Sequence, residues 1–66
     1  MQISLKAARV NANLTQKEAA KTIGVDVTTM VKWENGRTAP RLHQFKALCS
    51  LYGVDMDCIS LLSKSS

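Results

Sequence analysis

The chain has 66 residues, of which 45% are hydrophobic and 21% charged, and its nine Lys and Arg against five Asp and Glu give a net charge of +4. Residues 1–66 are long enough for one small domain, which buries too little surface to enclose a large active site. The basic excess favours a polyanionic partner, although a lysine-rich surface without such a partner would carry a similar charge. No apolar run approaches the roughly 20 residues of a membrane span and no signal peptide is evident, so we expect a cytoplasmic protein.

The first helix is predicted over residues 5–12. Ser4 stands where an N-cap belongs, and Asn13 stands where a left-handed residue would end the helix. One side of this helix carries Leu5, Ala8, Arg9 and Ala12.

The second and third helices follow at once. Thr15 and Glu18 form a T-x-x-E capping box, which starts a helix at Gln16, and Gly24 ends that helix. Asp26 is expected to cap a third helix over residues 27–35, which ends at Gly36.

Two more helices complete the predicted fold. Pro40 fits the first turn of a fourth helix that ends at Gly53. Asp55 can cap a short fifth helix through Ile59, Leu61 and Leu62, and the polar end at 62–66 is expected to fray. Because no run alternates between apolar and polar residues, we predict a compact all-α domain of five helices.

The second and third helices read as a helix-turn-helix. Gly24 lies between them, where the backbone needs a positive φ, Val25 fills the turn from inside, and the small Ala20 allows the helices to cross closely. The inward faces are expected to carry Ala19, Ile23, Met30 and Trp33. Any αα-hairpin would share a single alanine and glycine, but the whole pattern followed by "WENG" is more specific.

With these motifs the chain resembles the phage repressor/Cro family of helix-turn-helix proteins, also called the xenobiotic-response-element family. The resemblance runs over about residues 3–62, through "LKAARVNANLTQKEAA", "IGV", "WENGRTAP" and "LYGVDMDCI". It implies a lambda-repressor-like fold that binds double-stranded DNA. Small departures from the family pattern occur at Asn13, Ala19, Arg41 and Tyr52, and that at Arg41 leaves the cap of the fourth helix open.

The resemblance also implies that Arg9 and Glu34 form a structural ion pair between the first helix and the end of the third. Each of these residues lies on or beside an apolar helix face, where a buried charge without a partner would cost several kcal/mol. The alternative is two unrelated surface charges.

Base contacts are predicted on the outer face of the third helix. Val27, Thr28 and Val31 are poor helix formers with no inward role, so contact with base edges and thymine methyl groups would explain them. Lys32 can donate to guanine O6 or N7. In the family, the residues matching Val27, Thr28 and Lys32 read bases.

Phosphate contacts are predicted on both sides of that helix. The start of the second helix offers Gln16 and Lys17. The turn after the third helix offers Asn35, Arg37 and Thr38, which in the family run along the DNA backbone, and Arg41 extends this track.

The two cysteines do not suggest a metal site. Cys49 and Cys58 lack C-x-x-C spacing, and His43 is not placed to complete a zinc site, so we expect two reduced thiols at or near the core, and neither metal nor cofactor. The sequence also lacks a Ser/His or Cys/His arrangement, a plausible pair of catalytic carboxylates and a phosphate-binding glycine loop, so we expect neither an enzyme nor a small-molecule substrate.

These observations favour a sequence-specific DNA-binding transcriptional regulator of the phage or mobile-element type. We expect a homodimer on a palindromic operator, because one recognition helix reads few base pairs. The proposed contact is the apolar surplus near the end of the chain, part of which must belong to the core: Val54, Met56, Cys58, Ile59, Leu61 and Leu62. The alternative is an interaction module of the same fold, such as an antitoxin-like subunit whose main partner is a protein.

Overall fold

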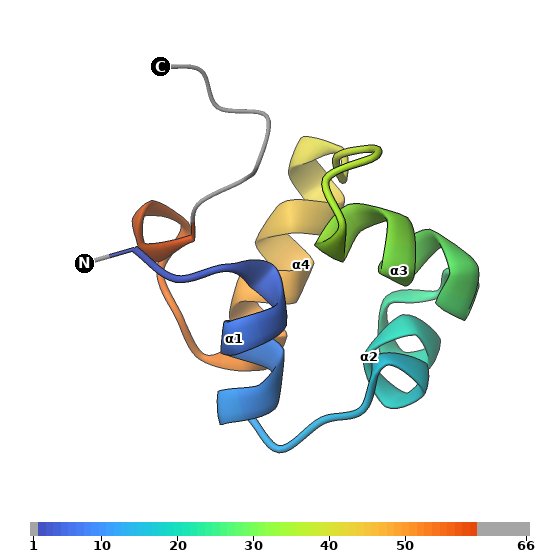
Figure 1. Ribbon diagram of the computed structural model, residues 1–66. Coiled ribbons are helices and arrows are strands. Elements are labelled where there is room, and N and C mark those ends of the chain that lie inside the picture. Colours follow the sequence, from blue (N-terminus) through green and yellow to red (C-terminus); the bar gives the residue numbers. More distant parts are fainter. Residues whose placement is uncertain (1, 60–66) are drawn as a thin grey trace.

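The computed structural model describes residues 2–59, which form four α-helices and one 3₁₀-helix (Figure 1). In chain order these are α1 (Leu5–Asn11), α2 (Gln16–Ile23), α3 (Val27–Glu34), α4 (Leu42–Tyr52) and η1 (Met56–Cys58). The helical class and the order of the first four helices agree with the sequence prediction.

The predicted fifth helix is not an α-helix over the residues that the structure describes. Only Met56–Cys58 turn, as a short 3₁₀-helix, and Ile59 is already extended with φ −100° and ψ 127°. Ile59 pairs with Ile3 in a parallel bridge, where the Ile3 N–H donates to the Cys58 carbonyl at 2.7 Å. This pairing places the start of the described chain beside η1 (Figure 1). The predicted continuation of this helix through Leu61 and Leu62, and the predicted fraying of 62–66, lie outside the described residues.

Side chains set where the helices begin. The Ser4 hydroxyl accepts the Ala7 N–H at 3.0 Å, and the Thr15–Glu18 capping box is complete. Asp26 precedes α3 but makes no side-chain capping bond.

The start of α4 was predicted wrongly, because Pro40 lies before the helix rather than in its first turn. The N-cap is Arg41, whose N–H donates to Gln44 Oε1 at 2.8 Å. This contact satisfies a free donor at the N-terminus of α4 and fixes the helix start at Leu42.

All four α-helices end in the same way, with one residue at positive φ followed by an N–H that returns to a carbonyl five residues back. The left-handed residues are Asn13 (φ 61°), Gly24 (90°), Gly36 (78°) and Gly53 (72°), so the prediction for Asn13 is confirmed. The returning bonds run from Leu14 to Arg9, Val25 to Ala20, Arg37 to Lys32 and Val54 to Cys49. Leu14, Val25 and Val54 pack against the core, whereas Arg37 is exposed. The end of α3 therefore presents an exposed cation where the other three helices pack an apolar side chain against the core.

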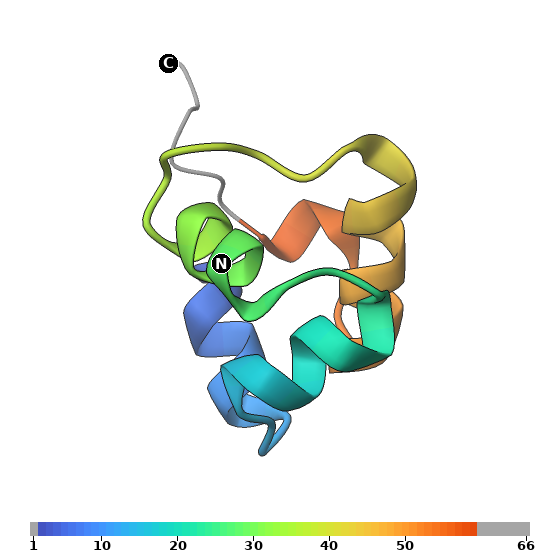
Figure 2. The ribbon, with the colours of Figure 1, turned by 90° about the vertical axis from the view of Figure 1, so that its right-hand side faces the viewer.

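The core lies where α2 and α3 meet α1 and α4. Met30 and Leu48 are fully buried, and the Tyr52 hydroxyl points at the Met30 thioether, 3.9 Å away. Ala19 and Ala20 are 0% and 2% exposed, and α2 packs more extensively against α3 than against α4. Figure 2 shows α2 and α3 together on one side of the molecule, with the segment 35–41 passing from α3 to α4. Among the helices of residues 2–59, none has the length and apolar character to cross a membrane.

Candidate nucleic-acid interface

The outward face of α3 carries the four residues predicted to contact bases. Met30 and Trp33 point into the core, which leaves Val27, Thr28 and Lys32 exposed and Val31 half-buried. Residues four apart lie above one another on a helix, so this face has two parallel rows. One row is apolar, Val27 and Val31, and the other is polar, Thr28 and Lys32. Methyl groups beside a hydroxyl and an ammonium group suit the mixed edge of base pairs in a major groove.

The segment after α3 is exposed and basic. The left-handed Gly36 turns the chain so that the Arg37 N–H reaches the Lys32 carbonyl at 3.0 Å. Asn35, Arg37, Thr38 and Arg41 are all exposed. This turn keeps the predicted phosphate-binding side chains next to the C-terminal end of α3.

The other predicted phosphate-binding residues, Gln16 and Lys17, open α2. Lys17 is exposed, but Gln16 is half-buried, and its Nε2 donates to Glu34 Oε1 at 3.0 Å. This contact is not evident from the sequence. A buried carboxylate accepts several hydrogen bonds, so a donor besides Arg9 was to be expected near Glu34.

Arg9 and Glu34 form a buried ion pair. Arg9 Nε lies 2.7 Å from Glu34 Oε2, and the two side chains are 10% and 2% exposed. A second guanidinium nitrogen donates to Glu34 Oε1 at 3.3 Å, and the third donates to the Leu14 carbonyl at 2.7 Å. This fork joins α1, the loop before α2 and the end of α3. Removing one partner of such a pair costs about 3–5 kcal/mol, because it leaves the other charge buried.

Tyr52 lies close to this pair. Burial, and after it the Glu34 carboxylate, raises the pKa of Tyr52 to about 12, while Arg9 acts in the opposite direction. The neutral phenol is therefore the form that the folded protein favours.

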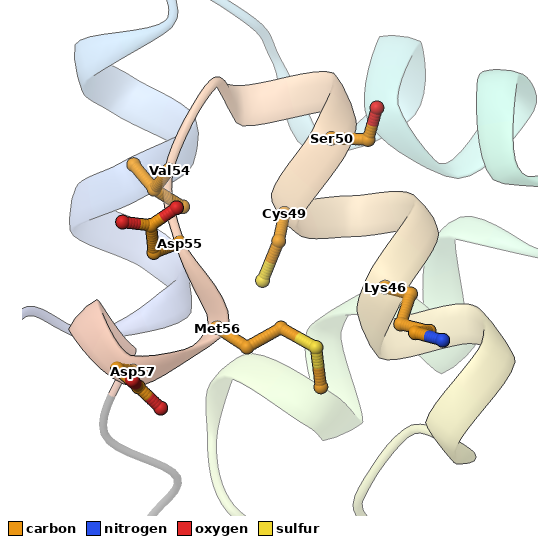
Figure 3. Close-up of a pocket in the computed structure, with 7 residues that line it drawn as sticks. All are labelled: Lys46, Cys49, Ser50, Val54, Asp55, Met56 and Asp57. Carbon is orange, nitrogen blue, oxygen red and sulfur yellow. The ribbon is translucent and has the colours of Figure 1, made fainter.

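A concave region lies between α4 and η1, and none of its lining residues belongs to α3 (Figure 3). It is an open hollow of about 500 Å³ lined by Lys46, Cys49, Ser50, Val54, Asp55, Met56 and Asp57. Both cysteines are free, and burial, followed by Asp55 and Cys58, raises the pKa of the Cys49 thiol. Two carboxylates against one lysine repel phosphate, so this hollow does not suit a nucleic acid.

The residues predicted for the dimer contact are only partly available on the surface. Ile59 is 5% exposed and belongs to the core, so it does not provide interface area. Val54 and Met56 are half-buried against the core, and Cys58 is half-buried. Leu61 and Leu62 lie outside the described residues.

An exposed recognition helix, held by a partner helix through a tight turn, defines a helix-turn-helix protein. A family model described as "Helix-turn-helix" matches residues 5–57. The chain belongs to this family, in its phage repressor/Cro type.

Two curated proteins are similar to the chain. The "HTH-type transcriptional activator BcrR" of Enterococcus faecalis is 32% identical over 53 residues, which are 80% of this chain and 26% of that protein. The "Cryptic phage CTXphi transcriptional repressor RstR" of Vibrio cholerae is 36% identical over 50 residues, 76% of this chain and 45% of that protein. The chain thus spans less than half the length of either relative. No solved structure gives a significant match.

Proposed function

We propose that this protein binds double-stranded DNA in a sequence-specific manner and regulates transcription. The observation that carries the proposal is the outward face of α3, with exposed cations near it: Lys17 in the helix that packs against α3, and Arg37 and Arg41 in the segment that follows it. Membership of the helix-turn-helix family and two relatives named as transcriptional regulators support it.

In the proposed complex α3 lies in the major groove. Val27 and Val31 contact thymine methyl groups, and Thr28 and Lys32 hydrogen-bond to base edges. Phosphate contacts from Gln16, Lys17, Asn35, Arg37, Thr38 and Arg41 hold the helix in register. One relative is named an activator and the other a repressor, so the position of the site relative to a promoter decides the direction of control.

We further propose that two chains bind a palindromic operator, as expected of a phage or mobile-element regulator acting on the cytoplasmic nucleoid. One face with four base-contacting side chains reads too few positions for the specificity ratio of about 10³–10⁷ that regulators reach. The half-buried Val54, Met56 and Cys58 are the described residues left for a contact between chains.

Selection of binding sites from a random DNA pool tests the proposal. We expect an enriched motif, and binding to it that weakens with salt by a slope of about −0.9 for each phosphate neutralised by Lys or Arg. A protein-binding module, such as the antitoxin-like subunit left open by the sequence, would enrich no motif. That outcome would contradict sequence-specific binding.

A further inference from the structure

The hydrogen bond between Gln16 and Glu34 fixes the orientation of one amide group. Gln16 is the first residue of α2, and its Nε2 lies 3.0 Å from Glu34 Oε1. A carboxylate has only acceptors, so the nitrogen of the amide, and not its oxygen, must face Glu34. The Gln16 side chain therefore has one defined orientation in the free protein.

The group that holds this amide is itself fixed. The Glu34 side chain is 2% exposed, and Arg9 binds both of its oxygens, at 2.7 and 3.3 Å. The same guanidinium donates to the Leu14 carbonyl at 2.7 Å, so the group that binds Glu34 is itself held in place. Gln16 is thus attached to a rigid point at the end of α3.

A primary amide has two N–H groups, and Glu34 takes only one of them. Gln16 is half-buried next to the exposed Lys17, so its amide lies at the boundary between the ion pair and the surface. We propose that Glu34 is a positioning residue for DNA binding, which holds one N–H of Gln16 and thereby directs the other towards a DNA phosphate. This inference rests on the proposed function, since it assigns a role within the same interface.

Such an arrangement has a distinct physical signature. A glutamine held before binding loses less side-chain entropy when it meets a phosphate than a free one. The contact is also neutral, so it releases no counterion and leaves the salt slope of binding unchanged. The neighbouring Lys17 would instead change that slope.

The side-chain amide of Gln16 can be followed by ¹⁵N NMR in the unaltered protein. The two amide protons of any glutamine give separate signals, because rotation about the C–N bond is slow. We expect the proton that faces Glu34 to be the one protected from exchange before DNA is added. Addition of the selected DNA site should shift the second proton and leave the first in place. Equal exchange protection of the two protons in the free protein, or no shift of the second on DNA, would overturn the inference.

Variants provide a second test. Gln16→Met should weaken binding to selected and random DNA alike, by about tenfold for each bound chain, with an unchanged salt slope. Lys17→Met, the control, should reduce the slope by about 0.9. Glu34→Gln should show the loss seen in Gln16→Met, and the double variant should bind no worse than Gln16→Met alone.

Glu18→Gln is the matched control for the lost charge. It removes the same charge as Glu34→Gln from a residue whose side chain hydrogen-bonds to Thr15 rather than to Gln16, and it keeps a capping-box side chain. The DNA affinity of Glu34→Gln is compared with that of Glu18→Gln. Both affinities are expressed per folded molecule, because Glu34→Gln also weakens the ion pair. If Glu34→Gln binds as well as Glu18→Gln, Glu34 is structural only. If the parent chain binds no DNA, the proposed function itself fails.

Discussion

Lys32 stands one turn after Thr28 on the exposed face of α3, with its ammonium group free to reach a base edge. We predict that Lys32→Ala weakens binding to the selected site by about 1–3 kcal/mol, and binding to random DNA much less. Equilibrium titrations on both DNAs measure the difference. Lys46→Ala is the control, because Lys46 lies at the hollow between α4 and η1. Equal losses on the two DNAs would assign Lys32 to a phosphate.

Tyr52 gives the fold a specific sensitivity to alkaline pH. Burial, then Glu34, raises the pKa of Tyr52 to about 12 in the folded protein, against an ordinary value of 10. The resulting stability is complete below pH 10 and disappears as the pH rises through 12, at about 2–3 kcal/mol in total.

Denaturation of the parent and of Tyr52→Phe between pH 8 and about 12 tests this expectation. The free energy of unfolding of the parent should fall more than that of the variant across that range. Both proteins carry the same lysines, so the effect of lysine titration cancels when the two profiles are subtracted. Parallel pH profiles would show that Tyr52 ionises in the folded protein as easily as in the unfolded chain.

At the scale of the element, Gly24 decides how α2 passes into α3. Its φ is +90°, and a Cβ added there would meet no atom within 4 Å, so the cost of a side chain comes from the backbone alone. We predict that Gly24→Ala lowers the free energy of unfolding by about 1–2 kcal/mol. Gly24→Asn should cost less, because asparagine tolerates the left-handed region. Denaturant titration compares the three proteins, and an alanine variant as stable as the parent would contradict the argument.

The elements that the sequence predicts best are those set by local chemistry. Ser4, Thr15 and Glu18 mark helix starts by bonds within one turn, and Asn13 and Gly24 end helices through their own φ angles. The last element was missed because Ile59 pairs with Ile3, a residue from the other end of the described chain. Local capping signals contain no information on such a pairing.

The features of the candidate site also fall into those that local sequence pattern predicts and those that depend on how the helices pack. Helical periodicity alone places Val27, Thr28 and Lys32 on one exposed face. The bond between Gln16 and Glu34 could not be read from spacing, because it depends on how α2 and α3 cross. The exposed Arg37 at the end of α3 is visible only when the four helix ends are compared in three dimensions.

For the whole molecule, we predict that DNA is bound by two chains on opposite halves of a palindrome, about 34 Å apart along the duplex. Insertion of about five base pairs between the half-sites turns one of them to the opposite face of the DNA. Affinity should then fall towards that of a single half-site, since the two contacts no longer reinforce each other. Equal affinity for the spaced site, or sedimentation of one chain per saturated site, would exclude the dimer.

The bridge between Ile3 and Ile59 also determines where other polypeptides can be attached. It brings both ends of the described segment together beside η1, which contacts α4, whereas α2 and α3 lie at the other side of the molecule (Figure 1). A fluorescent protein or a sensor domain fused before Gln2 or after Ile59 would therefore extend from one place, behind the surface that we assign to DNA. This geometry makes the segment a convenient unit for fusion proteins, because either end can carry cargo without standing between α3 and its groove.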